Sequence, residues 1–147
     1  LLKSLFATGK MDVTMAINGA IAGLVSITAD PLSPTGGTAV LVGALGGALV
    51  YVSILFLEKK GIDDPVGAIS AHGTVGIYGV LVVSLTGGAD FLGQLTGVAM
   101  IAAFTYIASL GVIYAINFVM PIRATDEEQD AGLDISEVGI EAYPEFD

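Results

Sequence analysis

Four long apolar segments dominate this chain and limit the folds that are open to it. They cover about residues 12–28, 38–57, 65–85 and 91–119, and the third contains no Asp, Glu, Lys or Arg. A helix needs about 20 mostly apolar residues to cross the ~30 Å hydrocarbon core of a bilayer. The segments therefore predict an all-α integral membrane fold with four transmembrane helices. The first segment is the weakest, because Asn18, Ser26 and Thr28 interrupt it, so we expect it to be buried among other helices.

The composition agrees with a membrane protein and argues against several other classes. The chain is 54% hydrophobic with a mean hydropathy of +0.81, and 14% of its residues are charged, against roughly a quarter in soluble domains. It has no cysteine and one histidine, which argues against a disulfide framework or a metal site. No phosphate-binding loop, nucleophile motif or basic nucleic-acid patch is present. The sequence therefore predicts a protein that is not an enzyme and has no cofactor or nucleic-acid partner. Because the chain lacks an initiator Met, we expect it to be a piece of a longer protein.

Turn-forming and charged residues mark the connections between the segments. Residues 30–37 form a loop rich in Pro and Gly, residues 58–64 a polar loop, and residues 86–90 a short third connection. Pro65 is predicted to open the third helix, since proline is favoured in a first turn. Asp64 would then lie at the positive end of that helix dipole.

The basic residues predict the orientation of the chain in the membrane. All five lie before the first segment, between the second and third, or after the fourth: Lys3, Lys10, Lys59, Lys60 and Arg123. Four crossings place these three regions on one side of the bilayer. The positive-inside rule therefore predicts that both ends of this chain are cytoplasmic, in a multi-pass protein of the plasma membrane.

The acidity of the chain belongs to its last residues. The net charge is −10, but residues 126–147 hold nine acids and no bases. We therefore divide the chain into a transmembrane region, residues 1–121, and an acidic cytoplasmic tail, residues 122–147. A solvated, disordered tail is one interpretation. The apolar residues within the tail favour an extended segment docked on protein as the other.

His72 is the main candidate for a functional side chain. It is the only histidine of the chain and lies in the third apolar segment. Ionisable side chains at membrane depth are costly and usually face a bundle interior or a transport pathway. Gly73, Gly76 and Gly79 follow at steps of three, and small residues let membrane helices approach closely. We therefore expect His72 to face the interior of the protein, although a packing role is the alternative.

Three segments resemble motifs of the ammonium transporter (Amt/Mep/Rh) family. Residues 18–28 read NGAIAGLVSIT and resemble the family segment NGALAGLVAIT. Residues 63–79 read DDPVGAISAHGTVGIYG and resemble its DDPxxxxxxHGxxGxxG helix. Residues 132–143 contain Gly132, Leu133, Asp134 and Tyr143, and are similar to its cytoplasmic tail motif GLDxxxHGExAY. The three motifs occur in the family's order and cover nearly the whole chain.

The resemblance implies a fold and a function. It implies the C-terminal portion of an eleven-helix inverted-repeat transporter, about its last four transmembrane helices and its tail. Each subunit of a homotrimer would conduct ammonium or ammonia through its own narrow hydrophobic pore. His72 falls on the second of two pore histidines, and Ala68 and Gly76, one turn away on either side, would line the same pore. The remaining helices of the transporter, the lipid bilayer and a PII-type signalling protein are the partners that the resemblance implies.

This chain departs from the family pattern in two places. Val138 and Ile140 replace the His and Glu of the tail motif, and Gly67 stands where an acid often follows the DDP triplet. Two other functions stay open. One is a membrane ammonium sensor, and the other is a non-transporting structural fragment of a split or nicked transporter.

Overall fold

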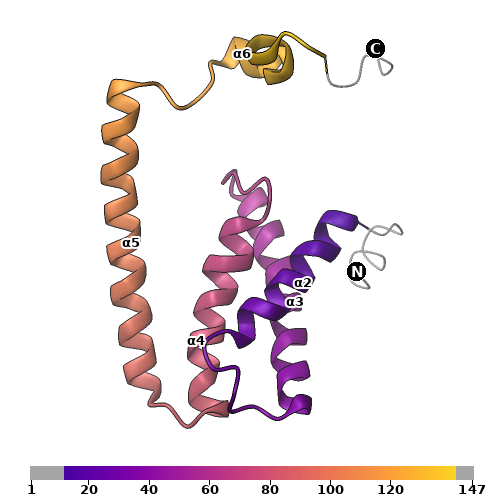
Figure 1. Ribbon diagram of the computed structural model, residues 1–147, viewed down its shortest axis with the longest axis vertical. Coiled ribbons are helices and arrows are strands. Elements are labelled where there is room, and N and C mark those ends of the chain that lie inside the picture. The colour runs from indigo at the N-terminus through magenta and orange to yellow at the C-terminus, as the bar shows by residue number, and fades with distance from the viewer. Residues whose placement is uncertain (1–11, 142–147) are drawn as a thin grey trace. The chain divides into compact units, whose positions relative to one another are not determined.

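Residues 12–141 are described by the computed structural model, and within them the secondary structure is entirely helical (Figure 1). The elements are α2 (Val13–Ile27), α3 (Gly36–Lys59), η1 (Ile69–Thr74), α4 (Val75–Thr86), α5 (Phe91–Val119), α6 (Asp126–Ala131) and η2 (Asp134–Val138). The two η elements are π-helical. The chain divides into two compact units, residues 1–101 and 102–147.

Three helices are long and apolar enough to cross a membrane. They are α3 with 24 residues, the continuous η1–α4 helix with 18, and α5 with 29. The prediction of an all-α membrane fold is thus confirmed, and α5 has the bounds predicted for the fourth segment. The first segment also forms a helix, but α2 has 15 residues, fewer than the ~20 that a crossing needs.

The start of the third helix differs from the prediction. Pro65 does not open it, because Pro65 and Val66 form a turn and the π-helix begins at Ile69. Gly67 causes this delay, since its φ of 71° is left-handed and interrupts the helix. Asp64 therefore lies one turn before the helix, and its side chain reaches across this turn to accept hydrogen bonds from the first N–H groups of the helix.

The first unit is built around a close crossing of α2 with α3 and α4. Ser26 of α2 is buried between two glycines, Gly46 of α3 and Gly79 of α4. A Cβ atom added to Gly46 would lie 2.8 Å from the Ser26 Cβ, and one added to Gly79 would lie 2.9 Å from the Ser26 carbonyl oxygen. The three backbones therefore meet at distances that only glycine permits. The buried side chains Ala22, Val50, Ile54, Ala71 and Val75 form the core beside this crossing.

The predicted glycine stripe of the third helix serves close packing at one position only. A Cβ on Gly73 would meet the Ile69 side chain at 3.9 Å, and one on Gly76 would meet Val25 at 4.0 Å, both ordinary contacts. Of the three glycines, only Gly79 lies so close to the backbone of another helix that a Cβ atom would clash with it. The interval of three residues therefore did not identify which glycine is required.

In the second unit, the described part of the acidic tail is helical rather than extended. Thr125 caps α6 through a reciprocal capping box with Glu128. Hydrogen bonds from the Thr125 backbone and hydroxyl hold the pKa of Glu128 below its usual value. Gly132 and Gly139 end α6 and η2 with positive φ angles of 94° and 72°. The caps of both short helices lie within the tail itself.

Candidate pore site around His72

His72 lies in a π-helical segment, Ile69–Thr74, at the beginning of the third apolar helix. The N–H of Val75 donates to the Ser70 carbonyl, the five-residue spacing typical of a π-helix. Short π-helical segments are rare and occur frequently at functional sites. The sequence predicted a helix here but gave no sign of its unusual winding.

Two of the three predicted pore residues lie on the open side of this helix, whereas Gly76 faces Val25 of α2. His72 and Ala68 are exposed and Gly76 is half-buried, whereas Ser70, Ala71 and Val75 are buried against α2 and α3. The first unit thus fixes one side of the helix and leaves the imidazole uncovered on the other.

Asp64 holds the N-terminal end of the π-helix. One carboxylate oxygen accepts a hydrogen bond from the Ile69 N–H at 2.9 Å, and the other accepts from the Ser70 N–H at 3.0 Å. Partial burial raises the pKa of Asp64, but the backbone donors outweigh this effect and leave the pKa below its usual value. A carboxylate that stays charged at this helix end is also favoured by the helix dipole.

Gly67 explains the departure from the family pattern at this position. It is buried, its φ is 71°, and a Cβ atom there would lie 2.7–2.9 Å from the carboxamide of Asn18. Asn18 is itself buried and donates to the Thr14 carbonyl at 3.2 Å. The space in which a larger residue would stand is therefore filled by a side chain of α2.

Two hydroxyl groups hold the C-terminal end of the π-helix against α3. Thr74 Oγ1 and Ser53 Oγ lie 2.9 Å apart, within hydrogen-bonding distance. One turn further on, the Tyr78 hydroxyl donates to the Val42 carbonyl of α3 at 3.3 Å. Sequence reasoning missed these contacts, although hydroxyl residues within apolar segments could have marked Ser53 and Thr74 as candidates for contacts between helices.

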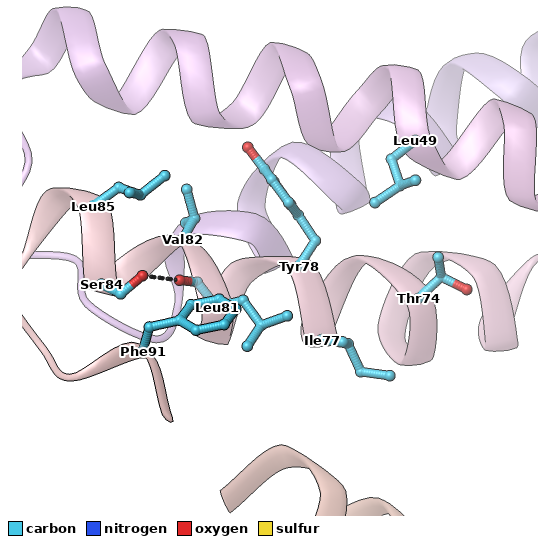
Figure 2. Close-up of a pocket in the computed structure, with 9 residues that line it drawn as sticks. All are labelled: Leu49, Thr74, Ile77, Tyr78, Leu81, Val82, Ser84, Leu85 and Phe91. Atoms are coloured by element: carbon cyan, nitrogen blue, oxygen red, sulfur yellow. Dashed lines mark hydrogen bonds between the residues drawn. The ribbon is translucent and has the colours of Figure 1, made fainter. Parts of the chain in front are cut away.

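An apolar groove of about 410 Å³ lies beside this contact, lined by residues of α3 and of the η1–α4 helix and by Phe91 of α5 (Figure 2). Its lining holds three hydroxyl groups, and each has a partner: Thr74 with Ser53, Tyr78 with Val42, and Ser84 with the Leu81 carbonyl. In Figure 2 the Tyr78 ring extends toward α3, and most of the other labelled side chains are apolar. The groove therefore offers hydrocarbon and no free hydroxyl to an occupant.

The predicted tail residues belong to the second unit. Gly132 ends α6, its carbonyl accepts from the Ser136 N–H at 3.0 Å, and a carboxylate oxygen of Asp134 accepts from the Ile135 N–H at 2.9 Å. Leu133 is exposed between them. Tyr143 lies outside the described residues. Among residues 12–141, no three His, Cys, Asp or Glu side chains gather in a way that could hold a metal ion.

The apolar helices and their short polar connections define this chain as a multi-pass α-helical membrane protein. A family model described as Ammonium Transporter Family matches residues 1–143. The chain belongs to the ammonium transporter family.

Individual relatives agree with this assignment. The chain is 36% identical to the ammonium transporter Amt1 of Haloferax mediterranei over 144 residues, which cover 94% of this chain and 28% of the relative. It is 35% identical to the ammonium transporter Amt2 of Methanocaldococcus jannaschii, with 91% and 34% covered, and 34% identical to an ammonium transporter of Bacillus subtilis, with 87% and 36% covered. The chain therefore spans about a third of the length of these relatives.

Proposed function

We propose that this chain is part of a transporter that moves ammonium or ammonia through a narrow hydrophobic pore, with His72 in the pore wall. The observation that carries this proposal is the setting of His72. It is the only histidine of the chain, and it lies uncovered on an apolar helix whose other side is fixed by packing and hydrogen bonds.

The chemistry of imidazole suits this role. Moving an ion through a dry, apolar passage is costly, whereas neutral ammonia can enter it and needs a hydrogen-bond partner there. Imidazole can accept a hydrogen bond at one nitrogen, donate at the other, and take up or release a proton near neutral pH. Ala68 and Gly76 would line the same pore, where small side chains leave room beside the ring.

We further propose that the chain forms the C-terminal portion of its transporter. Its motifs resemble those of the last four helices and the tail, and it spans about a third of its relatives. The remaining helices would cover the open side of η1 and complete the pore. In this proposal the whole subunit assembles as a homotrimer in the plasma membrane. The short helix α2, buried among other helices, completes a fourth crossing, so that both ends of this chain lie in the cytoplasm.

Transport assays with vesicles can test the assignment. We expect vesicles that contain the complete subunit to take up methylammonium, and vesicles that contain residues 1–147 alone to show no uptake, because four helices cannot enclose the pore. Uptake by the short chain would contradict the proposed partial pore. A complete subunit that binds ammonium but moves none would favour the membrane sensor, and one that does neither would favour a structural fragment.

The tail is proposed to regulate transport. Residues 132–143 carry the family's tail motif in part, and α6 and η2 give the described tail a defined local structure. We propose that Gly132, Leu133, Asp134 and Tyr143 dock the tail on the cytoplasmic face, partly against a neighbouring subunit, where a PII-type protein could reach it. Apolar anchoring should dominate, since exposed ion pairs contribute only about 0–1 kcal/mol each.

Tyr143→Asp is expected to release the tail and lower transport by every subunit of a mixed trimer, because a carboxylate cannot replace the aromatic anchor. Hydrogen exchange over residues 132–143 in the assembled transporter measures the docking, and Tyr143→Phe is the matched control that keeps the ring. Rapid exchange in the unchanged protein would show that the tail is a solvated extension.

A further inference from the structure

The hydroxyl pair formed by Ser53 and Thr74 has no part in the pore as proposed above. Ser53 is buried in α3, and Thr74 is the last residue of η1, two residues after His72. Their oxygen atoms are 2.9 Å apart although the residues are 21 positions apart in the sequence. The pair therefore joins two helices at the place where the π-helix changes into α4.

Four other serine and threonine hydroxyl groups in the apolar helices bond within their own helix. Ser26, Ser84, Thr86 and Thr96 each donate to a carbonyl three or four residues earlier in their own helix. Such bonds satisfy the hydroxyl without fixing one helix to another. The Thr74 hydroxyl instead has its partner on α3, so its hydrogen bond restrains the position of the η1 backbone.

His72 lies between two restraints of this kind. Asp64 fixes the first turn of η1 through the N–H groups of Ile69 and Ser70. Ser53 fixes Thr74 at the other end. The π-helix is rare and appears mostly as a single turn within an α-helix. Hydrogen bonds to residues outside η1 thus hold both of its ends.

We propose that Ser53 and Thr74 are positioning residues that preserve the π-helical turn and thereby fix the direction of the His72 imidazole. This inference rests on the proposed function, because it gives the two hydroxyls their role through the pore histidine. Loss of either hydroxyl would let the turn relax toward a regular α-helix and rotate His72. The consequence would be weaker selection of the substrate rather than loss of the folded protein.

The test uses the complete transporter subunit in vesicles and compares ammonium flux with potassium leak. Thr74→Val and Ser53→Ala remove one hydroxyl each at nearly constant shape. We expect each to lower the ratio of ammonium flux to potassium leak by about threefold or more, the size expected for one hydrogen bond between membrane helices. The double variant should resemble either single variant, because the same bond is lost in all three. Thr74→Ser, which keeps the hydroxyl, should retain the ratio.

Two control variants separate positioning from general stability. Tyr78→Phe removes another hydrogen bond between α4 and α3, to Val42, but further from His72. Ser84→Ala removes a bond within α4 only. We expect both to keep the flux ratio of the unchanged protein, even where Tyr78→Phe lowers the melting temperature.

The outcomes distinguish this inference from the proposed function. If Tyr78→Phe changes the flux ratio as much as Thr74→Val, the Ser53–Thr74 pair acts only by joining helices and the inference fails. It also fails if the two hydroxyl variants keep the normal ratio while His72→Ala loses it. If His72→Ala itself transports normally, the pore assignment fails first.

Discussion

His72→Ala is expected to abolish or strongly reduce ammonium transport by the complete transporter while the subunits still fold and assemble. The substrate loses its hydrogen bonds to water when it enters a dry pore, and the imidazole provides a hydrogen-bond partner in place of that water. Without the imidazole the substrate would lack this hydrogen bond, which costs about 1–3 kcal/mol and corresponds to a loss of about 5- to 150-fold in rate. Because His72 is exposed within this chain, the substitution opens no cavity among the buried residues of the first unit.

The rate of methylammonium uptake, set against the amount of assembled protein, measures this effect. His72→Glu is an informative second variant, because a carboxylate can still bond the substrate but also stabilises cations. We expect it to retain part of the flux with weaker discrimination against other cations. Normal uptake and normal selectivity in His72→Ala would reduce His72 to a packing residue and remove the pore assignment.

Gly79→Ala is expected to be the most destabilising of the alanine substitutions at the glycines of the third helix. The added Cβ would lie 2.9 Å from the Ser26 carbonyl oxygen and 3.2 Å from the Ser26 Cα. These are backbone atoms of α2, so relief requires the whole crossing to open. Overpacking of this kind costs about 1–3 kcal/mol. Unfolding of the purified transporter in detergent would measure the loss.

Gly73→Ala and Gly76→Ala are matched controls for this effect. They add the same methyl group to the same helix, where the nearest neighbours are side chains at 3.9 and 4.0 Å. Both should leave the free energy of unfolding nearly unchanged. Equal stability of all three variants would mean that the crossing at Ser26 is looser than the distances indicate.

The sequence was most informative where structure depends on local composition. The apolar segments predicted the helices, because hydropathy and length are properties of consecutive residues. Pro65 misled the prediction of a helix start, because the left-handed Gly67 and the reach of the Asp64 side chain decide that point. The sequence alone identified His72 as the candidate functional residue, but only the structure shows that it lies in a π-helical turn.

The sequence could not predict which residues of different helices contact one another. Nothing in the order of residues singles out Gly79 from Gly73 and Gly76, because the difference lies in the position of Ser26 on another helix. The pairing of Ser53 with Thr74 likewise depends on how α3 and η1 lie side by side. Asn18 belonged to a recognised motif, yet its contact with Gly67 required the fold.

The π-helical turn also sets the phase of the helix that carries His72. Four buried positions of this helix lie at every fourth residue: Ala71, Val75, Gly79 and Val83, with Ser70 buried beside the first. In a regular α-helix a stride of four overshoots a full turn by about 40°, so such a row would drift around the helix. The wider π turn advances less per residue and takes back part of the drift. Deleting one residue from 69–74 would thus rotate the His72 imidazole around the helix axis relative to Gly79. The length of this segment therefore determines together the direction of the imidazole and the packing of Gly79 against α2.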